Sequence, residues 1–170
     1  TRAGVVAPPI SYEVNGEQYI AVEVGWGGAY GLAAGPLALD SHAAGNFPRV
    51  LAFKLNGTDS LPAATAPAPR TLQPPKNTAT AAVVADGKAK YHRFCGTCHG
   101  DSAVSGGVLP DLRYSSALSN EALWKQIVHD GVLKTQGMVS FAPVLSESEI
   151  GAVRAYVVAR ANEDAARERN

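Results

Sequence analysis

The pattern of apolar and polar positions predicts β structure over residues 1–60. The segments Ser11–Val14 and Glu17–Val24 flank Asn15-Gly16, a pair that supplies the positive φ angles of a type I′ hairpin turn. A third strand is predicted over Arg49–Leu55. Three strands and a glycine-rich loop make a poor independent core, because so small a sheet buries too little surface. We therefore expect these strands to belong to a larger sheet outside the chain. The alternative is an ordered extension that rests on the rest of the molecule.

This pattern disappears between Leu61 and about Val84, where almost no bulky apolar side chains precede Leu72. Prolines are interleaved there with alanine and threonine, at positions Pro62, Pro67, Pro69, Pro74 and Pro75. Such a composition favours extended polyproline geometry and forms a semi-rigid spacer. We therefore predict three parts: a β segment over residues 1–60, a linker over 61–84 and a helical domain over 85–170.

Helical periodicity follows the linker. Asp86 is the expected N-cap of a short helix over Gly87–Phe94, and Ser119 is expected to cap a helix over Glu121–Val128. A capping box, Ser146-Glu147-Ser148-Glu149, opens the last helix. The apolar positions of that helix define its buried face: Ile150, Val153, Tyr156, Val157 and Val158. The charged tail from Asn162 to Asn170 is expected to fray.

The first of these helices leads into Cys95-Gly96-Thr97-Cys98-His99, and C-x-x-C-H is the attachment signature of c-type haem. The two thiols become thioethers by adding across the vinyl groups. Two intervening residues within a helical turn let both sulfurs reach one porphyrin edge. The adjacent His99 then faces the iron as an axial ligand.

Three other interpretations of the two cysteines compete with haem. A thioredoxin-like redox pair would need a βαβ context, which the flanking sequence does not indicate. A structural zinc site would need four ligands, and the remaining histidines, His42, His92 and His129, do not stand at zinc-finger spacing. A plain disulfide across two residues would be strained and would leave His99 unexplained.

The second axial ligand is sought by elimination. Haem iron in electron-transfer cytochromes is commonly held by His and Met, and the chain has a single methionine, Met138. It stands between Gly137 and Pro143 without helical periodicity, as expected of a loop that presents a side chain. A methionine that merely fills the core is the alternative role, and His129 is the rival ligand.

Composition narrows the function classes. The 170 residues permit one domain or two small ones, and the net charge is zero before the haem propionates are counted. No basic excess points to nucleic acid, and no apolar run approaches a membrane span. No signal peptide precedes Thr1. Bacteria attach haem covalently outside the cytoplasm, so we expect a periplasmic protein in which Thr1 begins a processed or cut chain.

The helical part resembles a class I cytochrome c. In that family a small residue and an aromatic on the first helix cross the last helix, and Gly87 with Tyr91 match this pair. The expected partners of the pair are Val153 and Tyr156. The family also has a proline whose carbonyl receives the Nδ1–H of the proximal histidine, and Pro110 matches it as the residue that would orient His99. The resemblance offers three candidates to hold the propionates, each equally well explained by packing or surface exposure: Arg113, Tyr114 and Trp124.

A β segment that ends in the run 19–28, a Pro/Ala linker and a Met-ligated haem domain together resemble the C-terminal part of a quinohaemoprotein alcohol dehydrogenase. That family carries an eight-bladed propeller that binds pyrroloquinoline quinone (PQQ) and calcium, followed by a cytochrome c domain. The resemblance implies that residues 1–60 are the last propeller strands. It also implies that Trp26 approaches the quinone; a stacking or structural tryptophan is the alternative.

The resemblance places the calcium ligands, the catalytic aspartate and most quinone contacts outside this chain, so we predict no catalytic residue here and no alcohol oxidation by the chain alone. The implied function is electron transfer, in which electrons arrive singly from the PQQ quinol of the propeller domain. They leave to an external acceptor such as a blue copper protein or another cytochrome. A free-standing monohaem carrier with a β docking extension is the alternative, and a ligand-sensing haem protein is a third interpretation.

Overall fold

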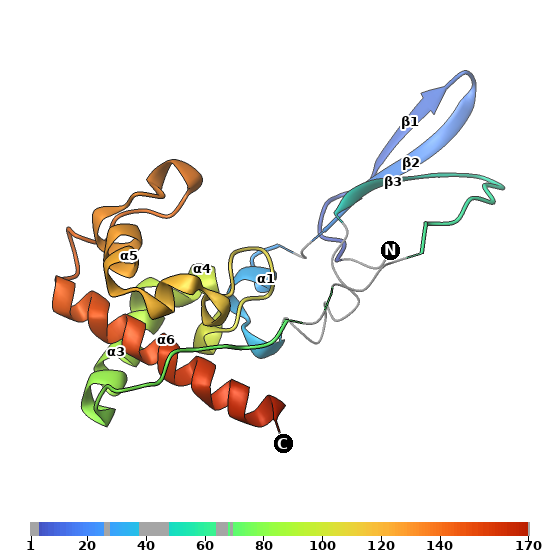
Figure 1. The fold of residues 1–170 in the computed structure, drawn as a ribbon. Coiled ribbons are helices and arrows are strands. Elements are labelled where there is room, and N and C mark those ends of the chain that lie inside the picture. The colour runs from blue at the N-terminus through green and yellow to red at the C-terminus, as the bar shows by residue number, and fades with distance from the viewer. Residues whose placement is uncertain (1–3, 26–27, 38–47, 64–67, 69, 170) are drawn as a thin grey trace.

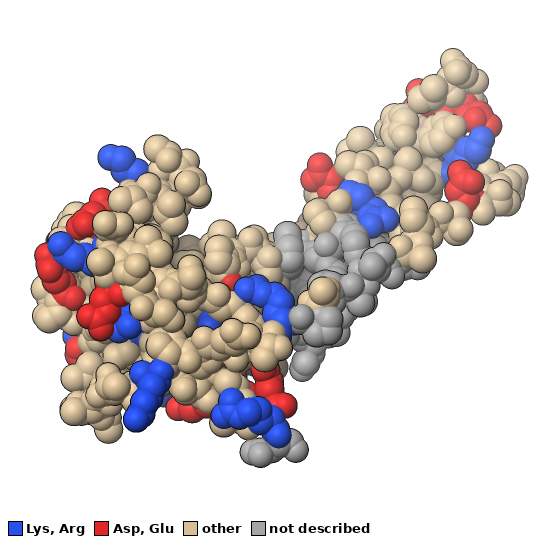
Figure 2. Space-filling view, viewed as in Figure 1, with Lys and Arg blue, Asp and Glu red and all other residues tan. Residues whose placement is uncertain are grey.

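The computed structural model describes residues 4–25, 28–37, 48–63, 68 and 70–169. They form a small antiparallel sheet near the N-terminus and a larger helical body, from which the sheet projects (Figure 1). On the face that Figure 2 shows, acidic and basic side chains are interspersed over the described part of the helical body. Within the described residues, none of the helices has the length and apolar character needed to cross a membrane.

The sheet contains three strands in the order β1 (Ile10–Val14), β2 (Glu17–Val24) and β3 (Arg49–Lys54), each antiparallel to its neighbour. Asn15 and Gly16 have φ angles of 53° and 80°. Positive values at both central positions are those of a type I′ turn, so the predicted hairpin and third strand are confirmed. The sheet includes no other described strand.

Most side chains of the sheet are exposed. Its buried side chains within the described residues are three: Ala21, Val24 and Leu51. Large apolar side chains of the strands stay open to solvent: Ile10, Val14, Ile20, Val50 and Phe53. A three-stranded sheet normally needs a second layer to cover its apolar face, and no described residue provides that layer.

Between β2 and β3 the chain returns to the helical body. The short helix α1 (Tyr30–Ala33) contacts α4 (Gly96–His99). Gly35 has a φ of 57°, and a Cβ there would lie 2.5 Å from the carbonyl oxygen of Asp101. Residues far apart in sequence therefore meet at the C-x-x-C-H segment. The predicted quinone-side residue Trp26 lies outside the described residues.

Two helices form the core of the helical body: α3 (Ala81–Phe94) and α6 (Glu147–Glu168). They cross at Gly87, where an added Cβ would lie 1.9 Å from the carbonyl oxygen of Ala152 and 3.1 Å from Cβ of Tyr156. One turn later the rings of Tyr91 and Tyr156 are 5.2 Å apart. The expected crossing of a glycine and an aromatic over the last helix is therefore confirmed.

The start of the first helix was predicted wrongly. It begins at Ala81, where the Thr80 hydroxyl accepts a hydrogen bond from the amide of Val83. Asp86 lies inside the helix and pairs with Lys90 one turn later. The run Ala81–Ala85 contains good helix formers after a threonine cap, so local propensity extends the helix into the predicted linker.

The second helix differs in its cap and its shape. Asn120, not Ser119, caps α5 (Glu121–Lys125), because its side chain accepts from the amide of Leu123. The chain then widens into one turn of π-helix, η4 (Gln126–Asp130). Short 3₁₀ turns complete the body: η1 (Asp101–Ala103), η2 (Leu112–Tyr114), η3 (Ser116–Ser119) and η5 (Lys134–Gln136).

The last helix keeps its predicted start and buried face but extends further than expected. The capping box of Ser146 and Glu149 is present. The helix continues to Glu168, so the prediction of a frayed tail from Asn162 is wrong. Tertiary contacts hold the last turns, because Asn162 donates from its side chain to the carbonyl of Pro75 at 2.9 Å and Asp164 accepts from several arginines.

Candidate haem site

The C-x-x-C-H segment continues the helical path of α3. The amide of Cys95 donates to the carbonyl of Tyr91 at 2.8 Å, and the amide of His99 donates to the carbonyl of Cys95 at 2.9 Å. Helix α4 therefore carries Cys98 and His99 on the turn that follows Cys95. Both cysteines are free thiols, Cys95 buried and Cys98 exposed, so both sulfurs remain available for thioether bonds.

The electrostatics of Cys95 argue against a redox-active dithiol. Burial, with a smaller contribution from Cys98, raises the pKa of the Cys95 thiol to about 12. Catalytic and redox cysteines have lowered pKa values, because the thiolate is the nucleophile. Among the described residues, no three His, Cys, Asp or Glu side chains gather as a metal-binding group.

His99 is held in one orientation. Its side chain is almost buried, and Nδ1 lies 3.0 Å from the carbonyl oxygen of Pro110. A carbonyl oxygen only accepts hydrogen bonds, so Nδ1 carries the proton and Nε2 keeps its lone pair. This is the tautomer that a metal-ligating histidine needs, with a hydrogen bond that raises its basicity. The structure thus confirms the predicted contact between Pro110 and His99.

Two further contacts fix the backbone that follows His99. The buried Tyr91 hydroxyl donates to the carbonyl of Gly100 at 2.9 Å. Gly100 itself has a φ of 85°, and a Cβ there would lie 1.8 Å from the carbonyl oxygen of Val104. Only glycine fits such a turn. The hydrogen bond from Tyr91 to Gly100 therefore links the crossing of α3 and α6 to the residue that follows His99.

The predicted sixth ligand, Met138, lies on a loop that the π-helix anchors. The amide of Phe141 donates to the carbonyl of Val128 at 2.9 Å, and the Ser140 hydroxyl donates to the carbonyl of His129. Because a π-turn shifts the hydrogen-bond ladder, it frees carbonyls for such contacts. The Met138 side chain is half-buried and packs against the core cluster that includes Cys95.

The rival ligand His129 is engaged elsewhere. Its Nδ1 lies 2.7 Å from the Asp130 carboxylate, close to the surface. This contact does not itself occupy Nε2. The Met138 side chain packs on the core cluster that contains Cys95, whereas the His129 ring pairs with Asp130, so Met138 remains the predicted ligand.

The three propionate candidates have partners within the protein. The Arg113 guanidinium binds the carboxylates of Asp111 and Asp164. Trp124 donates from Nε1 to the carbonyl of Ile150 at 3.1 Å. The Arg113 guanidinium and the Trp124 Nε1–H are the donors that a haem propionate would need. A propionate would therefore have to displace the Asp111 and Asp164 carboxylates from Arg113, or the Ile150 carbonyl from Trp124.

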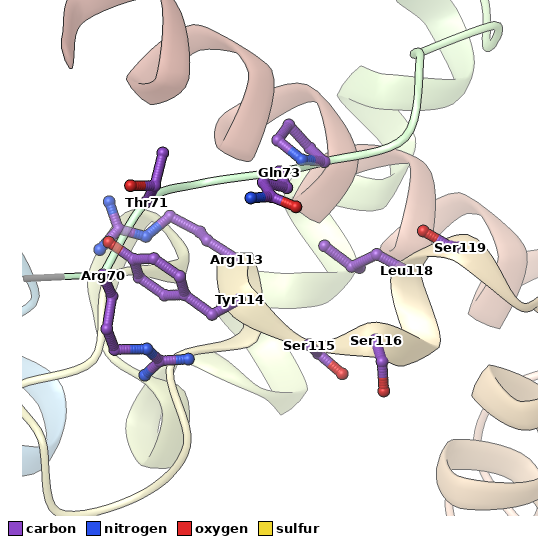
Figure 3. A pocket seen from close by; sticks show the side chains of 10 residues that line it. Arg70, Thr71, Gln73, Arg113, Tyr114, Ser115, Ser116, Leu118 and Ser119 are labelled. Atoms are coloured by element: carbon purple, nitrogen blue, oxygen red, sulfur yellow. The ribbon is translucent and has the colours of Figure 1, made fainter.

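Tyr114 lies beside a pocket of about 380 Å³, with the Arg70 guanidinium carbon 4.1 Å from the centre of its ring (Figure 3). Arg113 also lines this pocket. His99 and Met138 are absent from the lining, which comes from the 70–74 segment and residues 113–119. The pocket is therefore separate from the predicted axial ligands.

The residues present fit a covalent haem. Two unpaired thiols precede a histidine whose Nε2 has no hydrogen-bond partner among the described residues, and a methionine lies on a loop that packs on the same core. Val108 and Leu109, which precede Pro110 in the loop that contacts His99, are exposed apolar side chains. A flat apolar ring bound at His99 would be expected to cover side chains of this kind.

Comparison with known proteins agrees with this geometry. Residues 82–157 match the family model described as cytochrome c oxidase, cbb3-type, subunit III. The chain carries a cytochrome c domain. Such a domain implies haem c as its cofactor. The match includes the predicted haem attachment residues and both predicted axial ligands.

The whole chain is similar to larger proteins. It is 42% identical over 167 residues to the dehydrogenase subunit of alcohol dehydrogenase (quinone) from Gluconobacter oxydans, which covers 95% of the chain and 21% of the relative. It is 40% identical over 165 residues to quinohaemoprotein alcohol dehydrogenase ADH IIB from Pseudomonas putida, covering 96% of the chain and 24% of the relative. The chain thus spans less than a quarter of the length of these relatives.

Solved structures give the same result. Quinohaemoprotein alcohol dehydrogenase ADHIIG from Pseudomonas putida superposes with a TM-score of 0.80 at 38% identity, over 94% of this chain and 23% of the other. The enzyme from Comamonas testosteroni superposes with a TM-score of 0.65 at 30% identity, over 96% of this chain and 23% of the other. The resemblance to the C-terminal part of quinohaemoprotein alcohol dehydrogenases is confirmed.

Sequence reasoning missed the polar contacts that support the ligand. The hydrogen bond from Tyr91 to Gly100 and the pairing of Asp111 with Arg113 were not predicted. The position of Asp111 directly before Leu112-Arg113 was a usable signal, because an aspartate often caps the turn that follows it. The contact of Arg113 with the distant Asp164 depends on tertiary structure, so no local sequence pattern indicates it.

Proposed function

We propose that this chain is the electron-transfer part of a PQQ-dependent alcohol dehydrogenase. In this proposal the domain accepts electrons one at a time from the quinol of a PQQ- and calcium-binding propeller in the same parent protein. It delivers each electron to an external acceptor, such as a blue copper protein or a cytochrome, in the periplasm. The observation that carries the proposal is the similarity of nearly the whole chain to quinohaemoprotein alcohol dehydrogenases. The 3.0 Å contact between His99 Nδ1 and the Pro110 carbonyl, directly after two free thiols, supports the haem site within it.

Haem c, once attached at Cys95 and Cys98, supplies a one-electron iron centre whose potential the axial ligands and their surroundings set. The chain's own residues have the task of holding that centre rigidly. Pro110 fixes the orientation of His99, and the π-helix contacts fix the loop of Met138. Held in this way, His99 and Met138 would move little when the iron that they bind gains or loses an electron.

The exposed sheet supports a larger parent protein. Ile20 and Phe53 pair across β2 and β3, and both side chains are about half exposed. Apolar side chains of this size on a small sheet are expected to be covered by another layer. The relatives are more than four times as long as the chain that matches them, and thus have room for such a layer. A free-standing carrier would leave these strands without a packing role.

The first test is a haem-stained denaturing gel of periplasm from the source organism, probed with an antibody against this chain. We expect one haem band several times heavier than 17.6 kDa. Covalent haem survives denaturation, so the band reports attachment through Cys95 and Cys98 directly. A haem band at the mass of the chain alone would instead indicate the free-standing carrier, and an unstained band would refute haem attachment.

The axial ligands are tested separately in the haem-loaded chain. Met138→Ala should lower the reduction potential and allow fast carbon monoxide binding, because loss of the thioether opens one face of the iron. Val139→Ala is the matched control, since Val139 is exposed on the same loop. An unchanged potential and slow carbon monoxide binding in Met138→Ala would reassign the ligand, with His129→Ala as the next variant.

A further inference from the structure

Arg113 is a buried cation with three directed side-chain contacts. Its Nε donates to Asp111 Oδ1 at 3.0 Å, and Nη2 donates to Asp111 Oδ2 at 2.6 Å. Its Nη1 donates to Asp164 Oδ2 at 2.9 Å. The residue is only 9% exposed. A bidentate arginine–carboxylate pair of this kind fixes the relative orientation of the two side chains and pairs their opposite charges.

Asp111 passes this constraint to the loop that holds His99. The same carboxylate caps η2 by accepting from the amide of Arg113 at 3.1 Å, and it accepts from the amide of Ser105 at 3.4 Å. The Ser105 hydroxyl in turn donates to the carbonyl of Leu109 at 2.5 Å. These contacts close the loop on either side of Pro110, whose carbonyl binds His99.

Asp164 connects the loop to the last turns of α6. Its side chain is largely buried and also accepts from Nη2 of Arg160 at 3.0 Å. Arg160 donates from Nε to the carbonyl of Ser102, three residues after His99, at 3.2 Å. One end of α6 therefore holds the segment directly after the histidine and the loop that carries Pro110.

We propose that Arg113 is a positioning residue for the axial histidine, which it serves by locking Asp111 and hence the Pro110 carbonyl against His99 Nδ1. This inference rests on the proposed haem ligation by His99. It gives Arg113 a role different from the propionate anchor that the family resemblance implied. The guanidinium acts through the loop and touches neither the ring nitrogen nor the sulfurs directly.

The test uses Arg113→Lys in the haem-loaded full chain. Lysine keeps the charge but loses the fork that holds both oxygens of Asp111. We expect the His99 Nδ1 proton of the reduced protein, followed by NMR, to exchange with solvent roughly tenfold faster. The reduction potential should rise, because a less firmly hydrogen-bonded imidazole is a poorer donor and favours the reduced iron.

Arg154→Lys is the matched control. Arg154 also makes three side-chain contacts, two to the carbonyl of Leu118 and one to Glu121, but none to the loop around Pro110. A purely structural role for Arg113 predicts that both variants lose stability and leave proton exchange and potential unchanged. That result would overturn the proposal.

If Arg113→Lys does not accumulate, Asp164→Asn replaces it. This variant weakens the ion pairs of Asp164 with Arg113 and Arg160 but keeps the pair of Arg113 with both oxygens of Asp111. We therefore expect a smaller acceleration of His99 proton exchange in the same direction, and unchanged exchange would overturn the proposal. The haem-stained gel of each preparation separates the two hypotheses. Absence of covalent haem in the unsubstituted chain refutes the proposed function, whereas covalent haem with unaltered exchange in the variants refutes only the role of Arg113.

Discussion

The sheet and the helical body differ in how completely each one buries its own apolar residues. In the helical body, Tyr91, Leu118, Ile150, Val153 and Val157 are fully buried. In the sheet, Ile10, Val50 and Phe53 are each more than half exposed. A folded unit needs two packed layers around a core. The helical body has them, and the described sheet has one layer without its cover.

The segment that precedes α3 packs on the helical body from Arg70 onward. Leu72 is only 5% exposed, and the Pro75 carbonyl accepts from Asn162 on α6 at 2.9 Å. Arg70 stacks on Tyr114 at the pocket edge. The part of the predicted linker from Arg70 onward thus packs on the helical body as a strap. A free spacer would make no such contacts.

The largest effect is expected when the sheet and the helical body are produced as separate fragments. We expect the fragment 61–170 to attach haem and to unfold in one cooperative transition, with its Tm lowered by no more than roughly 8 °C through loss of the α1 contact. The fragment 1–60 alone should show no cooperative transition, because its sheet lacks a covering layer. Thermal unfolding followed by circular dichroism measures both. A cooperative transition in 1–60 would show that the sheet is stable by itself.

The next largest effect is expected at the helix crossing. Gly87→Ala should destabilise the haem-loaded chain by about 3 kcal/mol, because the added Cβ meets the backbone of Ala152 and overpacks the contact. Urea unfolding gives the free energy. Gly151→Ala is the matched control on α6, where a Cβ meets nothing within 4 Å. That variant should gain up to about 1 kcal/mol from helix propensity. Equal effects of the two substitutions would contradict the close crossing.

Elements with strong local signals were predictable from sequence. The Asn15-Gly16 turn and the Ser146 capping box define their own geometry within a few residues, and both are present. The contact between Pro110 and His99 followed from a family resemblance. The cap at Thr80 has no distinct signal in the sequence, because alanine and threonine also make up the linker before it.

Features that depend on tertiary structure escaped prediction. The last turns of α6 are held as helix by side-chain contacts. Asn162 bonds the Pro75 carbonyl, and Asp164 binds the guanidinium groups of Arg113 and Arg160. The π-turn after Lys125 is stabilised by the loop it supports, which no local pattern reveals. A charged C-terminal segment therefore looked like a fraying tail when taken alone.

The strap gives a third, smaller effect. Leu72→Ala should cost about 2 kcal/mol of unfolding free energy, since it removes a buried side chain at the boundary of the helical body. Thr71→Ala is the control, because Thr71 is its exposed neighbour. Both are measured by urea unfolding of the haem-loaded chain. A cost at Leu72 no larger than that at Thr71 would show that the segment is a free spacer.

The smallest change in unfolding free energy is expected for a substitution on the exposed face of the sheet. The test is informative because the same substitution can be measured in the parent protein. Phe53→Ser should change the stability of this chain by less than about 1 kcal/mol, because Phe53 contributes mainly a cross-strand pair with Ile20. If a second layer covers this face in the parent, the same substitution there removes a buried ring and should cost about 3 kcal/mol.

Measuring Phe53→Ser in both proteins by urea unfolding therefore tests whether the sheet is a fragment of a larger one. Val139→Ala serves as the control in both, since Val139 is exposed on the helical body. Because that position is remote from the sheet, the control should behave alike in the two contexts. A cost at Phe53 that is equally small in chain and parent would mean that nothing covers this face. The strands would then act as a docking surface for a separate partner.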